Sequence, residues 1–146
     1  MSTASTAGPD GIGTTTQSRS LLQGAAAGAA VATLVNAALW AGGRAADVSF
    51  LVTPLLGDTA TQVGIIPVLL TTLLTFAVGS GLLALAARRS RRSVRAVLVT
   101  AALVAVVSAG APPSAAQDTA SGVLLAAMHL VTGAAFLVTA SRVGAR

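Results

Sequence analysis

The chain has 146 residues, of which 54% are hydrophobic and only 9% are charged, and its formal net charge is +5. A water-soluble domain normally carries about 25% charged residues, so this composition excludes an ordinary soluble globular protein. The absence of cysteine excludes disulfide bonds, thiolate metal sites and thiol redox chemistry. The sequence therefore predicts an integral membrane protein.

The first 18 residues, MSTASTAGPDGIGTTTQS, are rich in serine, threonine and glycine and contain no apolar run. Such a segment buries too little apolar surface to offset the entropy lost on folding. We predict that residues 1–18 form a disordered tail. Residues 19–141 are predicted to form the membrane domain, and residues 142–146 a second tail.

Four apolar blocks follow the first tail. They cover residues 21–42, 63–87, 94–111 and 119–140, and each is near the roughly 20 residues that a helix needs to cross about 30 Å of hydrocarbon. A single strand cannot cross a bilayer, and the blocks lack the alternation of polar and apolar residues that strands show. We therefore predict an all-α fold, a membrane four-helix bundle whose helices run up, down, up and down.

The connections between the blocks predict where the helices begin and end and what covers the bundle. Residues 43–62 form the longest connection, and its short apolar centre is interrupted by proline and glycine, so we expect it to lie at the membrane surface and cap the bundle. Pro112 and Pro113 lack an amide hydrogen, and we expect them to stop the third helix. Asp118 is predicted to cap the start of the fourth helix, where free amide groups favour a carboxylate.

The nine basic residues are all arginine, and they are unevenly distributed. Four crossings place eight of them on one side of the membrane and only Arg44 on the other. Because arginine-rich connections stay in the cytoplasm, both termini and the turn between the second and third helices are predicted to be cytoplasmic. The abundance of alanine, valine, glycine and arginine indicates a bacterial coding bias, so the membrane is predicted to be the bacterial inner membrane.

The turn between the second and third helices holds the densest group of arginines. Its members are Arg88, Arg89, Arg91, Arg92 and Arg95. We expect this group to anchor the topology and to contact anionic lipid head groups. The turn is short, carries no aromatic residue and is tied to two membrane helices, so nucleic acid is not an expected partner.

Small residues recur at helical spacing and let helix backbones approach closely. We expect helix packing at Gly24, Gly28, Gly79, Gly122 and Gly133. The faces that carry these residues also permit a homo-oligomer or a membrane protein partner. His129 is the only histidine. It shares a face of the fourth helix with two of these glycines, so it is expected to point into the bundle rather than toward lipid.

Four polar side chains from four different helices fall at similar depths, within about 8 Å at a rise of 1.5 Å per residue. They are Asn36, Thr71, Thr100 and His129. The preferred interpretation of His129 is structural, a neutral side chain bonded to threonine or asparagine of another helix. An ionisable group inside a membrane is costly and usually functional, so the polar layer is also a candidate site for a small ligand or lipid in the outer half of the bundle. A pathway for protons is the third alternative.

Catalytic and cofactor motifs are absent from the sequence. There is no phosphate-binding loop, no HExxH motif and no cluster of metal ligands, so neither a cofactor nor a metal is predicted. Ser80 and His129 resemble a serine–histidine dyad, but their predicted depths differ by about 10 Å, too far for a hydrogen bond. The sequence predicts a non-enzymatic accessory subunit or ligand-binding or lipid-binding module. The alternative is a minimal transporter or channel that uses the polar layer.

Four short motifs resemble a family of small bacterial four-helix membrane proteins known as a domain of unknown function. They are NAALW at Asn36–Trp40, Pro67 at the start of the second helix, APPSAAQD at Ala111–Asp118 and HLVTG at His129–Gly133. The resemblance covers roughly residues 20–141 and implies no activity. It does imply that the first helix is retained rather than cleaved as a signal peptide.

Overall fold

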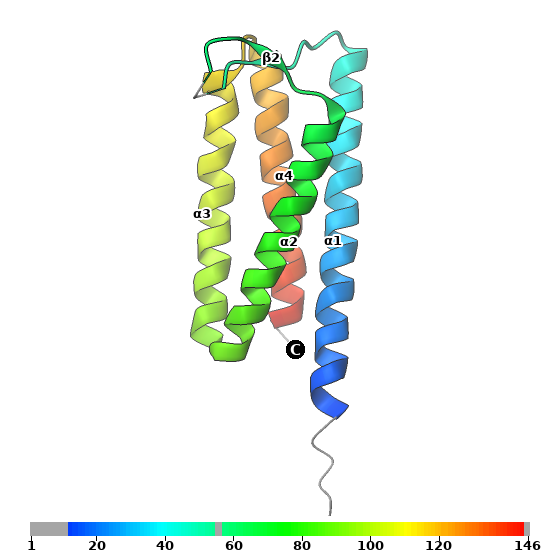
Figure 1. Cartoon of the computed structure of the whole chain (residues 1–146), viewed down its shortest axis with the longest axis vertical. Coiled ribbons are helices and arrows are strands. Elements are labelled where there is room, and N and C mark those ends of the chain that lie inside the picture. The colour runs from blue at the N-terminus through cyan, green and yellow to red at the C-terminus, as the bar shows by residue number, and fades with distance from the viewer. Residues whose placement is uncertain (1–11, 55–56, 145–146) are drawn as a thin grey trace, which may run out of the picture.

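A computed structural model describes residues 12–54 and 57–144 of the chain. Four long helices make up most of it, α1 (Ile12–Ala45), α2 (Ile65–Arg89), α3 (Arg91–Ala115) and α4 (Thr119–Gly144). They run alternately up and down and lie side by side (Figure 1). Two short strands, β1 (Leu51–Val52) and β2 (Thr61–Gln62), pair antiparallel within the α1–α2 connection. The predicted all-α fold of four helices is confirmed.

The two ends of the molecule differ in their connections. The short α2–α3 turn lies at one end, which we call the arginine end. The α1–α2 connection and the α3–α4 turn lie at the other end, which we call the loop end (Figure 1). The described start of α1 and the end of α4 both lie toward the arginine end.

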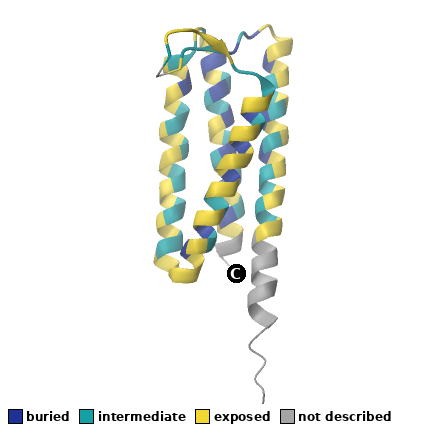
Figure 2. Cartoon of the chain, viewed as in Figure 1, coloured by how far each residue is buried: buried dark blue, intermediate teal, exposed yellow. Residues whose placement is uncertain are grey.

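Each helix contains a stretch that is long and apolar enough to cross a membrane. These stretches are Leu22–Ala45, Ile65–Arg89, Arg91–Ala115 and Thr119–Arg142. Exposed leucine and valine side chains occur on all four helices, and exposed positions are spread along the coloured part of each helix (Figure 2). Such surface is unfavourable in water and favourable against lipid chains. The chain therefore has the build of a multi-pass membrane protein.

The helices extend beyond the apolar blocks. α1 begins at Ile12 and continues through residues 12–18, which were expected to be part of a disordered tail, while residues 1–11 lie outside the described residues. Adding a residue to an existing helix costs far less than starting a new one, so polar residues can prolong an apolar helix. α4 likewise runs past residue 141 to Gly144.

The prediction that Pro112 and Pro113 stop the third helix is wrong. α3 continues to Ala115 with both prolines inside its last turns. The fixed φ angle of proline is itself helical, and the cost lies in the missing amide hydrogens. The helix closes after them, because Ala116 donates its amide hydrogen to the Pro112 carbonyl at 2.9 Å.

The core consists of two clusters, one toward each end. The loop-end cluster contains Val48, Phe50, Val68, Leu125 and Met128. The arginine-end cluster contains Ala32, Phe76, Leu83, Phe136 and Ala140, and four α3 residues, Val94, Val97, Leu98 and Ala101, pack against it. Among the described residues, α3 thus contributes to the arginine-end cluster and not to the loop-end cluster.

Glycines set the spacing between neighbouring helices at four of the five predicted positions. A Cβ atom on Gly28, Gly79, Gly122 or Gly133 would press on Thr139, Phe136, Pro113 or Ala105, respectively. At Gly133 the added atom would overlap the Ala105 side chain, so α3 and α4 could not keep their distance. Gly24, the fifth position, is half-buried on α1.

Gly133→Val is expected to destabilise the fold by about 1–3 kcal/mol, because overpacking forces two closely packed helices apart. The measurement is the free energy of unfolding in mixed detergent micelles. Gly81→Val is the matched control, since Gly81 has open space where its Cβ would lie. Its effect should stay within about 0.5 kcal/mol. Equal losses for the two variants would contradict a glycine-dependent contact between α3 and α4.

Candidate functional site

The structure does not gather the predicted polar layer into one site. Asn36 is 1% exposed. Thr71, Thr100 and His129 are all exposed. The Thr71 hydroxyl donates to the Pro67 carbonyl of its own helix at 2.7 Å. The four side chains therefore lie in different surroundings.

Thr100 also lies at a different depth from His129. Gly133 and Ala105 meet across the α3–α4 contact. Counting along both helices from this contact places Thr100 about 14 Å nearer the arginine end than His129, and counting from the Gly122–Pro113 contact gives about 9 Å. The continuation of α3 from residue 111 to Ala115 accounts for about 6 Å of this difference, because it moves every α3 residue away from the loop end.

Asn36 instead forms a buried polar trio with Thr72 and Thr132. Its amide group donates to the hydroxyl oxygens of both threonines at 2.9 Å. Each threonine hydroxyl in turn donates at 2.8 Å to the carbonyl four residues earlier in its own helix. The trio joins α1, α2 and α4 inside the bundle. The acceptor oxygen of Asn36 has no hydrogen-bond partner in the described part of the chain.

His129 is exposed, so the expectation that it is shielded from lipid is wrong. Its face was predicted correctly, because Gly122 and Gly133, which share it, lie against α3. Leu125 and Phe136 also lie on this side of α4 at helical spacing, and both are at most 8% exposed. His129 is therefore an exposed position on an otherwise covered face.

The hydrogen bond made by His129 defines the state of its ring. Its Nδ1 atom lies 2.8 Å from the carbonyl oxygen of Leu125, one turn earlier in α4. A carbonyl oxygen can only accept, so Nδ1 carries the hydrogen. In the neutral ring, Nε2 is then an acceptor.

Asp118 fastens the α1–α2 connection to the start of α4, and its predicted role as a helix cap is confirmed. Its Oδ1 atom accepts the Ser121 amide hydrogen at 2.7 Å. Its Oδ2 atom accepts the hydroxyl hydrogens of Ser49 at 2.6 Å and Ser121 at 2.7 Å. Ser121 Oγ accepts the amide hydrogen of Phe50 at 2.8 Å. Phe50 has a positive φ of 51°, and this bond helps to hold that backbone conformation.

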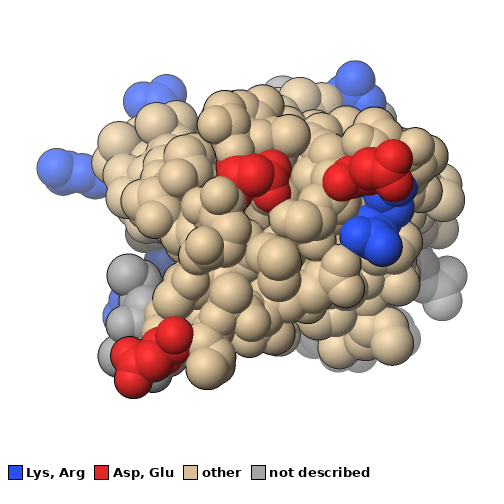
Figure 3. All heavy atoms as spheres, turned by 90° about the horizontal axis from the view of Figure 1, so that it is seen from above, with Lys and Arg blue, Asp and Glu red and all other residues tan. Residues whose placement is uncertain are grey.

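The connection covers the loop end of the bundle. Phe50 is fully buried and stacks on Trp40 with ring centroids 6.3 Å apart. The indole of Trp40 donates to the Val63 carbonyl at 3.0 Å. Val52 pairs with Ala116 in the α3–α4 turn, so that turn is tied to the same cover. Figure 3 looks onto this end and shows acidic side chains at separate places, one of them beside a basic side chain.

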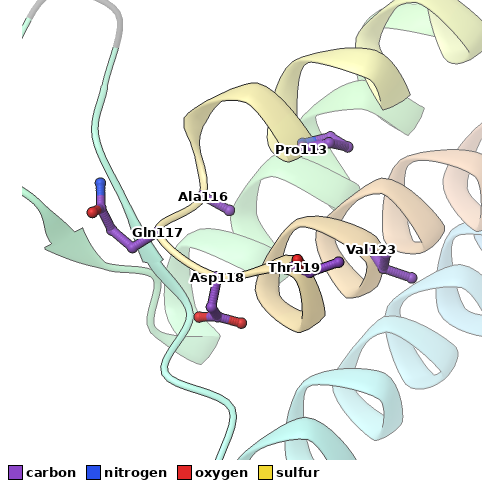
Figure 4. Close-up of a pocket in the computed structure, with 6 residues that line it drawn as sticks. All are labelled: Pro113, Ala116, Gln117, Asp118, Thr119 and Val123. Carbon is purple, nitrogen blue, oxygen red and sulfur yellow. The ribbon is translucent and has the colours of Figure 1, made fainter.

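A hollow of about 240 Å³ lies beside the α3–α4 turn (Figure 4). It is lined by Pro113, Ala116, Gln117, Asp118, Thr119 and Val123. The only charged side chain among these residues is that of Asp118, and both of its carboxylate oxygens accept hydrogen bonds from serines in the helix cap. The hollow is therefore explained by the structural role of Asp118, and we do not assign a ligand to it.

The arginine end presents the five predicted anchor residues on both sides of the α2–α3 turn. Arg88, Arg89, Arg91, Arg92 and Arg95 are all exposed. Ser90 ends α2 and caps α3, where its hydroxyl oxygen accepts the Ser93 amide hydrogen at 3.1 Å. A one-residue turn thus concentrates positive charge where the helices end.

Four apolar helices, three of which are joined by a buried polar trio, define a small multi-pass membrane protein of the four-helix class. No group of three or more metal-binding side chains occurs among the described residues. The chain belongs to a family of unknown function, DUF6069, whose pattern matches residues 16–146. This match confirms the resemblance read from the sequence. Neither a curated protein nor a solved structure matches the chain.

Thr72→Val should lower the free energy of unfolding by about 0.6–2 kcal/mol, since it removes one acceptor of the Asn36 amide inside the membrane. Thr75→Val is the matched control, because the Thr75 hydroxyl is exposed and bonds only to the Thr71 carbonyl of its own helix. The measurement is the free energy of unfolding of both variants in mixed detergent micelles. If Thr75→Val cost as much as Thr72→Val, the trio would have no special role.

The Asp118 cap should make stability fall in acid. The hydrogen bond from the Ser49 hydroxyl, followed by those from Ser121, lowers the pKa of Asp118 and outweighs the effect of desolvation. The contribution is complete above the ordinary aspartate pKa of about 3.9, and it is lost as the pH falls from there through the folded-state pKa. Thermal midpoints between pH 7 and pH 2.5 should show this loss.

Asp118→Asn should remove most of that acid dependence, and its thermal midpoint should approach that of the wild type as the pH falls. Asp58→Asn is the control, because Asp58 is exposed in the same connection. If the difference in thermal midpoint between the wild type and Asp118→Asn stays constant with pH, the charge of Asp118 does not stabilise the cap.

Proposed function

We propose that this chain is a non-enzymatic membrane module that binds a lipid or another apolar molecule at the loop-end half of the bundle. The observation that carries the proposal is the exposure of His129 between buried neighbours on one face of α4. In a bilayer, lipid reaches that face. The remaining support comes from the way in which α2 and α3 pack.

α2 crosses the bundle at an angle. In its loop-end half, Thr72 is bonded to Asn36 of α1. In its arginine-end half, Leu83 belongs to the cluster against which Val94 of α3 packs. Figure 1 shows α2 leaning from the side of α1 at its start to the side of α3 at its end. α2 and α3 therefore separate toward the loop end, on the side where His129 is accessible.

The surface of α3 supports the same conclusion. Leu103, Val104 and Val107 are each at least 58% exposed. The loop-end half of α3 is held by its glycine contacts with α4 and by the Val52–Ala116 pairing. Apolar side chains that no helix covers are available to lipid chains or to a ligand that resembles them.

The buried trio argues against the transporter or channel alternative. Its three members, Asn36, Thr72 and Thr132, are at most 8% exposed, and their polar hydrogens are all used in hydrogen bonds. A conducting path needs polar groups that face a shared opening. The other members of the predicted polar layer face outward instead.

Protease chemistry is disfavoured by position. The rings of Phe76 of α2 and Phe136 of α4 pack edge to face, and these helices run in the same direction. Counting from that contact places Ser80 about 16 Å nearer the arginine end than His129. A nucleophile and its base need hydrogen-bond contact. An accessory subunit is the other non-enzymatic candidate, in which a partner helix would cover the lipid-exposed surface.

The proposal includes an orientation. We place the protein in the bacterial inner membrane with both termini and the arginine end in the cytoplasm. The exposed arginines then lie against the anionic lipid head groups of the cytoplasmic leaflet. The half of the bundle around His129 lies toward the outer leaflet.

Native mass spectrometry of protein released from a mild detergent tests the proposed function. A lipid-sized adduct at one copy per chain, or at one copy per protomer of an oligomer, is the expected result. Bare protein would contradict the proposal, and a bound polypeptide without lipid would replace it with the accessory subunit. Flux across liposomes containing the pure protein would favour the transporter.

Labelling of single cysteines tests the orientation. The chain has no cysteine, so an introduced one is unique. Asp58→Cys at the loop end should react with a membrane-impermeant maleimide on intact spheroplasts. Ser90→Cys at the arginine end should react only after permeabilisation. The opposite pattern would place the arginines outside the cell and contradict the topology.

A further inference from the structure

We propose further that His129 Nε2 accepts a hydrogen bond from the hydroxyl group of a neutral lipid. The lipid lies along α4 between the loop-end halves of α2 and α3. The inference rests on the proposed function and specifies the chemical class of the ligand. It is carried by the geometry of the His129 ring and by the shape of the surface around it.

The ring can act toward a ligand in only one way while neutral. Because Nδ1 donates to the Leu125 carbonyl at 2.8 Å, the second nitrogen has a lone pair and no hydrogen. The bond also fixes the direction of the ring relative to α4. A ligand that meets Nε2 must therefore supply a donor.

The depth of His129 makes that donor necessary. His129 follows the start of α4 at Thr119 by ten residues, which is about 15 Å along the helix axis and close to the middle of the bilayer. Water is scarce at this depth, and an unpaired polar atom costs several kcal/mol at most sites in hydrocarbon. A bound hydroxyl group would remove this penalty for both partners.

The same depth selects an uncharged ligand. A phosphate or ammonium group is costly to bring to the middle of the hydrocarbon. Ester and ether oxygens can reach it more cheaply, but they only accept hydrogen bonds and do not match Nε2. A lipid whose polar part is a free hydroxyl meets both requirements.

The shape of the surface favours a lipid over a helix of another protein. Toward the arginine end, Leu83 of α2 and Val94 of α3 belong to one packed region, and only Ser90 separates the two helices. The accessible region is therefore confined to the loop-end half of the bundle. A partner helix that spans the bilayer would meet the closed half, whereas an alkyl chain that runs from His129 toward the loop end fits within the open half.

The only histidine of the chain provides the probe for this contact. Protein labelled with ¹⁵N-histidine and carrying no histidine tag gives signals from one imidazole ring. In phosphatidylcholine nanodiscs, the spectrum should show hydrogen on Nδ1 and an Nε2 acceptor. Adding 1-hexadecanol should shift the Nε2 signal, and adding methyl hexadecyl ether should not. An Nε2–H ring, or equal responses to both compounds, would overturn the inference.

Binding to variants tests the same contact independently. In native mass spectrometry, His129→Phe should retain hexadecanol about threefold to tenfold less than the wild type, the range set by one hydrogen bond. Retention of the ether should be unchanged. His129→Gln keeps an acceptor and should restore part of the selectivity. If His129→Phe does not fold, the nitrogen spectrum of the wild type still decides the question.

The outcomes separate the two proposals. Lipid retained equally by the wild type and His129→Phe, without preference for the alcohol, would overturn the hydroxyl contact and leave the lipid-binding function standing. No retained lipid in either protein would overturn the proposed function itself. An Nε2 atom already hydrogen-bonded in pure phosphatidylcholine nanodiscs would show that water or a second copy of the chain is the donor, and would overturn the lipid assignment.

Discussion

The amide of Asn36 fixes the positions of three helices at one depth, and the rest of the arrangement follows from it. Its bond to Thr72 holds the first half of α2 against α1, while Thr132 brings α4 to the same point. The one-residue turn at Ser90 holds the end of α2 beside α3. α2 cannot satisfy both constraints while lying straight along the bundle, so it leans. α3 is then left with α4 as its neighbour toward the loop end.

The number, order and approximate limits of the helices could be predicted, because hydrophobic length and arginine placement are local properties of the sequence. The role of Asp118 could also be predicted from its neighbours in the sequence, because a carboxylate directly before an apolar block has nearby amide groups to bind. The double proline gave a wrong prediction, because its effect depends on a hydrogen bond that the sequence does not show. A proline near the end of a helix costs little if the next amide closes the turn, as Ala116 does, and the sequence does not show whether it will.

The functional residues were harder to predict, because the depth of a residue in the membrane does not define the direction in which its side chain points from the helix. Thr71 and Thr72 are adjacent, yet a rotation of about 100° separates their side chains around the helix. One faces outward and the other bonds to Asn36. The buried spacing of Val68, Thr72 and Phe76 on α2 was the available signal. The exposure of His129 had no such signal, since it depends on the lean of α2 and hence on contacts between distant residues.

The bond between Asn36 and Thr132 joins residues 96 positions apart, on the first and the fourth of the described helices. During membrane insertion, α1 therefore carries a bare amide into hydrocarbon long before α4 exists. A lone asparagine in that environment favours contact with water, with the insertion machinery or with any polar helix nearby. The buried trio is thus complete only when α4 has been inserted, and until then the amide of Asn36 needs another hydrogen-bond partner.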